Sequence, residues 1–498
     1  MRLPTVLFLC FTVIITAARS NEKPFQLSRA HLLYGQSYYG LALADSDLTP
    51  NYFTQKVDHF DDSNSKTFSQ RYYFNDQWYK SGGPSFLFVG GESEANPNLI
   101  QNEALPWIVI AKQANARVFL LEHRFYGASQ PTGDLEVASL KFLTSQQALP
   151  DINDFILGIN ANLSLTSPLW ITFGGSYAGS LSAWARLKYP DTVFAAVASS
   201  ATVKAVVDFS QSLDVVYSAL HAYNPKCADS LSSGFGRLNE LVKTPAGRDE
   251  LTANFSLCRN LENDDSDIIN YFYGAMISNY MTTVQYSHVN IPSYNDTLTI
   301  ENLCANQLKG DVNGYGGIIS VTDWLLKYYG ETCVDINFDS YISYIKAGTA
   351  GTFGGNFKAW FWQSCNEFGD FKSTNSNATN SIFTRPDVPV DYFIKQCVTI
   401  FGDVFSNATV YANIDKTNAC YAGQNFNASR VVSSNGSNDP WHVLSILQAN
   451  NAELYPITVA GAGHLADTYP PGANDPVALD TVRGKIRNHV LQWTSAGG

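Results

Sequence analysis

Short apolar runs of strand length recur along this chain, and stretches with helical spacing lie between them. The runs are rich in β-branched and aromatic residues and end in small or polar residues, as buried strands do. Strands that alternate with helices predict an α/β fold, in which helices cover both faces of a mostly parallel sheet. The expected strands are 85–91, 116–124, 168–175, 194–201, 430–436 and 455–464, and the expected helices between and after them are 105–115, 146–160 and 476–494.

A long interval, residues 202–428, separates the fourth expected strand from the fifth. A connection of this length cannot be a loop inside a compact domain, so it predicts a subdomain. Its apolar residues have helical rather than alternating spacing, which indicates a mostly helical cap. The predicted organisation is a signal peptide at 1–20, an α/β domain in two parts at 21–201 and 429–498, and the cap at 202–428, inserted late in the sheet.

The amino terminus has the pattern of a secretory signal peptide. A basic Arg2 precedes an apolar core, and the small residues Ala18 and Ser20 suit cleavage after about Ser20. No later stretch has the roughly 18 to 20 uninterrupted apolar residues that a transmembrane helix needs. We therefore expect a secreted or lysosomal protein without a membrane span.

Seven of the eight cysteines lie between residues 227 and 420, and the eighth, Cys10, lies in the signal peptide. Clustering of this kind in an oxidising compartment predicts that disulfides brace the cap. Because seven is odd, at least one thiol stays free or pairs with another chain. Glycans are expected at several of the N-x-S/T sequons, which lie at Asn162, Asn254, Asn295, Asn377, Asn407, Asn427 and Asn435.

The charge balance and the missing motifs exclude several functions. The chain has 32 basic and 44 acidic side chains, a formal charge of −12, which argues against a nucleic-acid partner. No H-E-x-x-H, C-x-x-C or G-x-x-x-x-G-K-[ST] pattern is present, and no G-x-G-x-x-G follows an expected strand. We therefore expect neither a metal nor a cofactor.

The segment ITFGGSYAGS, residues 171–180, places Ser176 in a turn between an expected strand and a helical stretch. A catalytic serine at such a nucleophile elbow needs small neighbours because the backbone bends sharply there, and glycine and alanine flank Ser176. The pattern departs from G-x-S-x-G, because Ala178 stands where the second glycine would be and Gly179 follows it. The alternative interpretation is a serine in an ordinary β–α turn.

Chain order favours the catalytic interpretation. The triad of an α/β hydrolase runs Ser, then Asp or Glu, then His along the chain. Asp439 and His464 follow the last two expected strands, at the edge where open α/β sheets bind their ligands. In this interpretation His464 takes the proton from the Ser176 hydroxyl and returns it to the leaving group, while Asp439 orients the imidazole.

Other polar residues near these positions have simpler explanations. Asp467 is too close to His464 in sequence to act as the triad acid, so we expect it to order the loop. We expect His442 at the rim of the site and His123 in a structural or pocket-lining role.

An acyl-transfer site also needs N–H donors for the oxyanion. The backbone of Tyr177 supplies one, and Gly91 supplies the other from the turn formed by Gly90, Gly91 and Glu92 after the first expected strand. The alternative for these glycines is a plain tight turn.

Several motifs together resemble the serine carboxypeptidase S28 family, which includes lysosomal Pro-X carboxypeptidase, dipeptidyl peptidase II and thymus-specific serine protease. The motifs are GGSYAG, NGSNDPW and GAGHLAD, with EHRFYG, QRYYFND and VDHF. The resemblance runs from about Tyr52 to Trp493 and is strongest to the thymus-specific branch.

The resemblance implies an α/β-hydrolase fold whose helical cap restricts the enzyme to peptide ends, typically beside proline. It implies that Ser176, Asp439 and His464 form the triad. The family pattern of cysteines implies the pairs Cys227–Cys304, Cys258–Cys333 and Cys365–Cys397, and it leaves Cys420 over.

The kind of peptide end stays open, because a carboxypeptidase must hold a carboxylate and a dipeptidyl peptidase an ammonium group. Glu92 is a candidate for the amine, with bracing of its loop as the alternative. Trp441, Trp360 and Trp362 are candidates for a proline pocket, with core packing as the alternative.

We expect peptide substrates and allow for a homodimer. The competing functions are an esterase or lipase, disfavoured because no HGGG-type loop is present, and a non-catalytic binding protein.

Overall fold

The computed structural model describes residues 48–166, 168–261, 265–291, 297–309, 313–378, 381–383 and 387–496, so the expected signal peptide lies outside the described residues. An eight-stranded sheet in the order β1-β2-β4-β3-β5-β6-β9-β10 forms the centre of the molecule. Its strands are β1 (Asn51–Lys56), β2 (Thr67–Asn75), β3 (Ser85–Val89), β4 (Arg117–Leu121), β5 (Trp170–Gly175), β6 (Ala195–Ser199), β9 (Val431–Gly436) and β10 (Leu454–Val459).

The sheet is parallel from β4 to β10, and only β1 and β2 run antiparallel to their neighbours. Every residue of β3, β4, β5, β6 and β9 is buried, because helices cover both faces. This is the predicted α/β-hydrolase architecture. Strands β1 and β2 were not predicted, because they form one edge of the sheet and mix buried with exposed residues.

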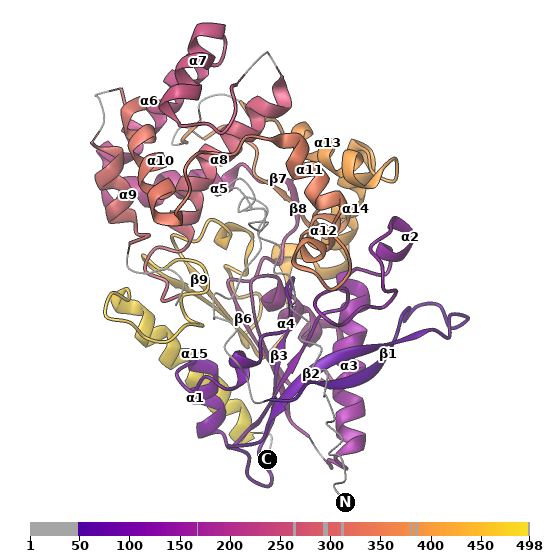
Figure 1. Ribbon diagram of the computed structural model, residues 1–498. Coiled ribbons are helices and arrows are strands. Elements are labelled where there is room, and N and C mark those ends of the chain that lie inside the picture. The colour runs from indigo at the N-terminus through magenta and orange to yellow at the C-terminus, as the bar shows by residue number, and fades with distance from the viewer. Residues whose placement is uncertain are drawn as a thin grey trace, which may run out of the picture.

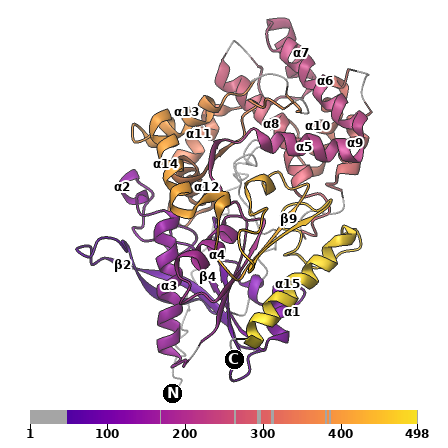
Figure 2. The same cartoon turned by 180° about the vertical axis from the view of Figure 1, so that it is seen from behind.

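Helices pack on the two faces of the sheet as separate layers (Figures 1 and 2). On one face, α3 (Ser145–Asn162) and α4 (Tyr177–Lys188) share a core with β5 and β6. On the other face, α1 (Pro106–Gln113) packs beside α15 (Val477–Ala496). Shorter helices lie at α2 (Val137–Leu140), η2 (Pro97–Ile100), η4 (Gly423–Asn425) and η5 (His442–Leu444).

Between β6 and β9 the chain leaves the sheet and builds a helical cap over one end of it (Figures 1 and 2). Helix α8 runs through the cap core, and nearly all of its residues are buried. The cap contains α5 (Gln211–Tyr223), α6 (Pro225–Leu241), α7 (Pro245–Asn254), α8 (Ser266–Gln285), α9 (Ile300–Gln307), α10 (Tyr315–Tyr329), α11 (Phe338–Lys346), α12 (Phe353–Gln363), η3 (Ser364–Phe368), α13 (Val390–Phe401) and α14 (Asn407–Tyr421), with a small sheet of β7 (Val206–Asp208) and β8 (Gly369–Phe371).

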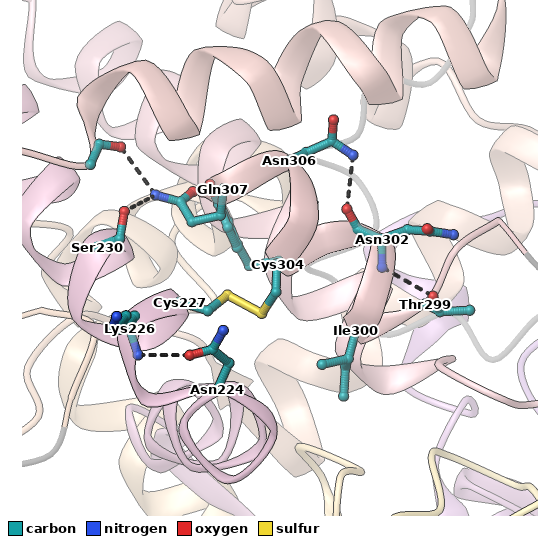
Figure 3. The surroundings of a disulfide bond; sticks show 12 residues. Asn224, Lys226, Cys227, Ser230, Thr299, Ile300, Asn302, Cys304, Asn306 and Gln307 are labelled. Atoms are coloured by element: carbon teal, nitrogen blue, oxygen red, sulfur yellow. Dashed lines mark hydrogen bonds between the residues drawn. A yellow bond between two sulfur atoms is a disulfide. The ribbon is translucent and has the colours of Figure 1, made fainter. Parts of the chain in front are cut away.

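Disulfides brace this cap. Figure 3 shows the bond that joins α6 to α9, and beside it Gln307 donates a hydrogen bond to Ser230 of α6 at 3.0 Å. A disulfide that closes a long loop removes conformational freedom from the unfolded chain and so stabilises the folded cap. The structure pairs Cys227 with Cys304, Cys258 with Cys333 and Cys365 with Cys397, as the resemblance implies, and Cys420 is a free thiol.

The sequons differ in accessibility. Asn435 is only 2% exposed at the end of β9, so the folded chain leaves no room for a glycan there. Asn295 lies outside the described residues, whereas Asn162, Asn254, Asn377, Asn407 and Asn427 are exposed and remain predicted attachment sites.

Among the helices in the described part of the chain, none is both long and apolar enough to cross a membrane.

Candidate active site

Ser176 lies at the sharp turn between β5 and α4, with φ 57° and ψ −130°. A non-glycine residue rarely adopts positive φ, and such strain persists only where the surroundings enforce it. Here other backbone segments come very close to this turn. A Cβ atom at Gly174 would lie 2.1 Å from the carbonyl oxygen of Ala178, and one at Gly179 would lie 2.9 Å from that of Ser199. The glycines therefore permit the sharp turn that a nucleophile elbow requires. The second glycine, Gly179, lies one residue later than in the G-x-S-x-G pattern.

Asp439 follows β9 and His464 follows β10, so both lie at the same edge of the sheet as Ser176. The Nδ1 atom of His464 donates to Oδ2 of Asp439 at 2.7 Å, and both side chains are buried. In the neutral ring this hydrogen bond places the proton on Nδ1, so the lone pair that can accept a proton is on Nε2. The backbone N–H of Trp441 donates to the other carboxylate oxygen at 2.9 Å.

The cap holds the histidine loop in place. The carbonyl oxygen of Gln285, the last residue of α8, accepts a hydrogen bond from the His464 backbone at 2.7 Å. The side chain of the same glutamine accepts one from Trp441 Nε1 at 3.1 Å. Gln285 thus joins the loop of the histidine to the loop of the aspartate, and no motif in the sequence indicates this role.

The two expected oxyanion donors lie beside the elbow. The Tyr177 N–H is the first of helix α4, where no carbonyl of the preceding turn can accept it. Gly91 packs against the same helix, because a Cβ atom there would lie 3.3 Å from Cβ of Ala178. Both glycines of this turn and Glu92 line a cavity of about 200 Å³, which the cap closes with residues 351–353 and Asn356. Glu92 is 3% exposed.

The candidate tryptophans occupy three different environments. Trp441 lies beside Asp439, as described above. Trp360 is buried against the ring of Tyr177, with 5.4 Å between the ring centres. Trp362 packs in the cap interior against Phe401 and Phe405, which is the core-packing alternative.

The other polar candidates have structural partners. Asp467 accepts hydrogen bonds from the hydroxyls of Ser199 and Ser434, at 2.6 and 2.8 Å, so it ties two strand ends together. His442 bonds through Nδ1 to the Asp439 carbonyl oxygen. His123 donates from Nδ1 to the carbonyl oxygen of Arg124, and burial lowers its pKa to about 4. The neutral ring then accepts a hydrogen bond at Nε2 from the hydroxyl of Tyr177, at 2.9 Å.

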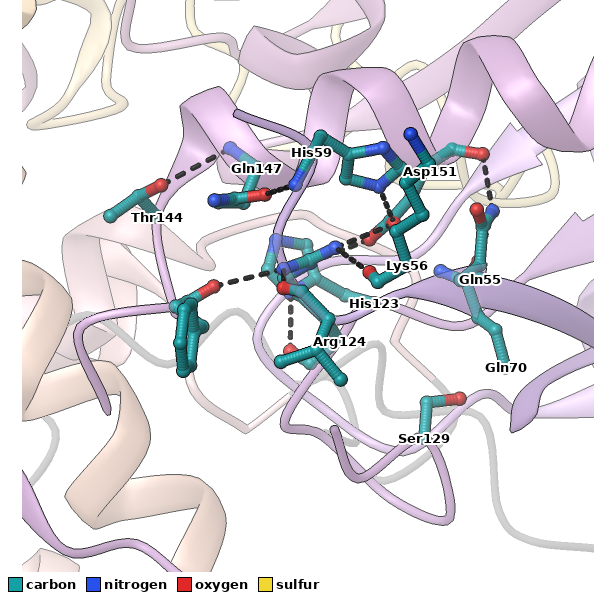
Figure 4. A network of polar contacts seen from close by, with 12 residues as sticks. Gln55, Lys56, His59, Gln70, His123, Arg124, Ser129, Thr144, Gln147 and Asp151 are labelled. Atoms are coloured by element: carbon teal, nitrogen blue, oxygen red, sulfur yellow. Dashed lines mark hydrogen bonds and ion pairs between the residues drawn. The ribbon is translucent and has the colours of Figure 1, made fainter. Parts of the chain in front are cut away.

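A buried ion pair fixes the loop that carries His123 (Figure 4). The Arg124 guanidinium donates two hydrogen bonds to Asp151 of α3, at 2.6 and 2.7 Å, and His59 contacts the same carboxylate. Burial alone would raise the pKa of Asp151, but Arg124 and His59 outweigh it and hold the pKa below its usual value. The EHRFYG and VDHF motifs therefore contribute scaffolding to the site.

A second polar network, missed in the sequence, lies under the elbow and connects it to the cap. The amide nitrogen of Gln363 donates to the hydroxyl of Tyr177 at 3.0 Å, and its oxygen accepts a hydrogen bond from Tyr126 at 2.7 Å. One turn later in the cap, Glu367 accepts hydrogen bonds from the backbone and hydroxyl of Ser145, at 2.9 and 2.6 Å. Tyr177, the residue after Ser176, is thus held by the cap.

Glu367 predicts a pH dependence of stability. Burial raises its pKa from 4.5 to about 7, although its hydrogen bonds work against the shift. Because the folded-state pKa is the higher one, its contribution is fully present below 4.5 and is lost as the pH rises through about 7. A shift of this size corresponds to about 3 kcal/mol. We expect the stability of the wild type relative to Glu367→Gln to fall by up to this amount between about pH 4.5 and about pH 8.

Denaturant unfolding followed by tryptophan fluorescence measures this difference at each pH. The control is Glu103→Gln, which removes an exposed carboxylate paired with Lys112. The control should follow the wild type throughout. A constant difference between Glu367→Gln and the wild type across the pH range would contradict the prediction.

Comparison with known proteins gives matches over most of the chain. The model of the family described as serine carboxypeptidase S28 matches residues 55–486. A putative serine protease of Caenorhabditis elegans is 36% identical over 99% of both chains. The thymus-specific serine protease of Homo sapiens is 33% identical over 88% of this chain and 85% of its own length. The lysosomal Pro-X carboxypeptidase of Homo sapiens is 27% identical over 89% of this chain and 87% of its own.

Proposed function

Because the chain belongs to the serine carboxypeptidase S28 family of serine-type peptidases, we propose that it shortens peptides from one end, beside proline, through an acyl-enzyme formed on Ser176. The hydrogen bond between Asp439 and His464, buried at the sheet edge behind the elbow, carries this proposal. The name of the Pro-X carboxypeptidase relative supports the preference for proline.

In the proposed reaction, Ser176 Oγ attacks the scissile carbonyl carbon while His464 Nε2 takes its proton. Asp439 keeps the imidazole in the required tautomer and stabilises its positive charge. The N–H groups of Tyr177 and Gly91 stabilise the oxyanion. When the intermediate collapses, the leaving amine takes the proton from His464, and water then hydrolyses the acyl-enzyme by the same steps.

The cap supports action at chain ends. We propose that residues 202–428 form a unit that covers the reaction centre, since Gln285, Gly351 and Asn356 all lie beside it. A substrate must enter between this cap and the edge of the sheet, which favours a chain end over an internal segment. The match to a lysosomal relative is compatible with the expected secreted or lysosomal location.

Digestion of a peptide library, read by mass spectrometry, tests the proposal. We expect products that lack one carboxyl-terminal residue or an amino-terminal dipeptide, at bonds next to proline. Protein inactivated beforehand with a fluorophosphonate probe is the control and should give no products. Internal fragments, or terminal trimming without regard to proline, would contradict the proposed specificity. Hydrolysis of short esters without cleavage of any peptide would favour the esterase alternative instead.

A further inference from the structure

Lys372 is a buried cation for which the described residues supply no hydrogen-bond acceptor. It follows β8 and is 3% exposed. In the part of the chain that the structure describes, its ammonium group donates no hydrogen bond and has no carboxylate at ion-pairing distance. Burial of an unpaired ammonium group is costly, and buried charges in proteins are normally paired. Burial also lowers the pKa of Lys372, while the charge of Asp370 works against that change.

This cation lies next to the proposed reaction centre. Lys372 Nζ is 4.0 Å from the centre of the Trp441 ring. The backbone of Trp441 bonds to Asp439, and its indole bonds to Gln285, which in turn holds His464. A cation–π contact replaces only part of the hydration that Lys372 has lost. The ammonium group therefore still has N–H donors that can bind a ligand.

A second unsatisfied group lies beside the first. Asp370 is 8% exposed and has φ 58°, and its Oδ1 atom has no hydrogen-bond partner among the described residues. The Asp370 carboxylate accepts a hydrogen bond from the backbone of Val206. Burial raises the pKa of Asp370, although the charge of Lys372 opposes the shift. In the protonated form Asp370 offers an O–H donor, so the two side chains together present donors and one positive charge.

We propose that Lys372, with Asp370 beside it, binds a carboxylate of the peptide substrate next to the face of Trp441. The carboxylate comes from the carboxyl terminus of the peptide or from an acidic side chain near the scissile bond. This carboxylate would accept the hydrogen bonds of the Lys372 ammonium group and would orient the peptide at Ser176. This inference rests on the proposed peptidase function and assigns a specificity-determining residue to it.

The test compares substrates that differ by one negative charge. One pair is a proline-containing peptide as free acid and as carboxyl-terminal amide, and a second pair has Glu or Gln beside the scissile bond. We expect the wild type to prefer the charged member of one pair by roughly 10- to 100-fold in kcat/KM, the range for a hydrogen bond to a charged group. The pair that shows the preference identifies the source of the carboxylate.

Variants then assign the preference to Lys372. Lys372→Met should bring the ratio close to one, and Lys372→Arg should retain most of it. The matched control is Lys204→Met, which removes a half-buried lysine from a neighbouring groove lined by His442 and Val443, and should keep the wild-type ratio. A wild type without preference in either pair, or an unchanged ratio in Lys372→Met, would overturn the proposal.

A binding measurement separates this proposal from the catalytic one. Peptides that occupy the site slow the labelling of Ser176 by a fluorophosphonate probe, whether or not they are cleaved. We expect the charged peptide to protect wild-type protein at a roughly 10-fold lower concentration than its neutral partner. Equal protection by both would overturn the carboxylate subsite even if Lys372→Met fails to fold. Absence of any labelling would instead count against the proposed function itself.

Discussion

Ser176→Ala protein is expected to show no labelling by a fluorophosphonate probe and a loss of about 10⁴- to 10⁶-fold in kcat. Alanine removes the Ser176 hydroxyl from the turn between β5 and α4, so no acyl-enzyme can form there. The residual rate would come from the oxyanion donors and from substrate binding, which the substitution leaves in place.

Ser180→Ala is a suitable control for this variant. Ser180 is also buried in α4, one turn later, and its hydroxyl is shared between the carbonyl oxygen of Thr202, at 2.9 Å, and that of Ser176, at 3.3 Å. The control should lose a hydrogen bond and some stability but keep its labelling. Labelling of Ser176→Ala at the wild-type rate would remove Ser176 from the mechanism.

The sequence predicted the central strands well because of where they lie. Strands buried on both faces read as continuous apolar runs, so β3, β4, β5, β6 and β9 were found within a few residues of their ends. The edge strand β10 is partly exposed, and its expected carboxyl end lay five residues too far along the chain. Strands β1 and β2 have one partly exposed face, and β7 and β8 have three residues each, so their patterns were too weak to recognise.

The candidate triad could be anticipated because the order of parallel strands fixes which loops meet. Loops that follow β5, β9 and β10 must lie at the same edge of the sheet, whatever the cap does. The contacts of Tyr177 with Gln363 and of His464 with Gln285 depend on how the cap docks, and the residues in each pair are far apart in sequence. No local sequence pattern encodes such contacts. In the same way, the sequence could not distinguish Trp362, which packs in the cap core, from Trp441, which lies beside Asp439.

Asp439→Asn is expected to lower kcat by about 10³- to 10⁴-fold while the protein stays folded. The Trp441 N–H donates to Oδ1, so it should keep the amide oxygen on its own side and turn the amide nitrogen toward His464. A donor in that position requires Nδ1 to accept, which moves the ring proton to Nε2. His464 would then be unable to take the proton of Ser176, and probe labelling should slow in parallel with kcat.

The neighbouring carboxylate of Asp467 offers a matched control for that substitution. It is also buried near His464, but it accepts its hydrogen bonds from the hydroxyls of Ser199 and Ser434. Asp467→Asn keeps one acceptor for these hydroxyls, so its kcat should fall by less than about tenfold. If both variants lose activity equally, the effect comes from disturbed packing at the sheet edge. Only a loss confined to Asp439→Asn assigns the tautomer of His464 to this single hydrogen bond.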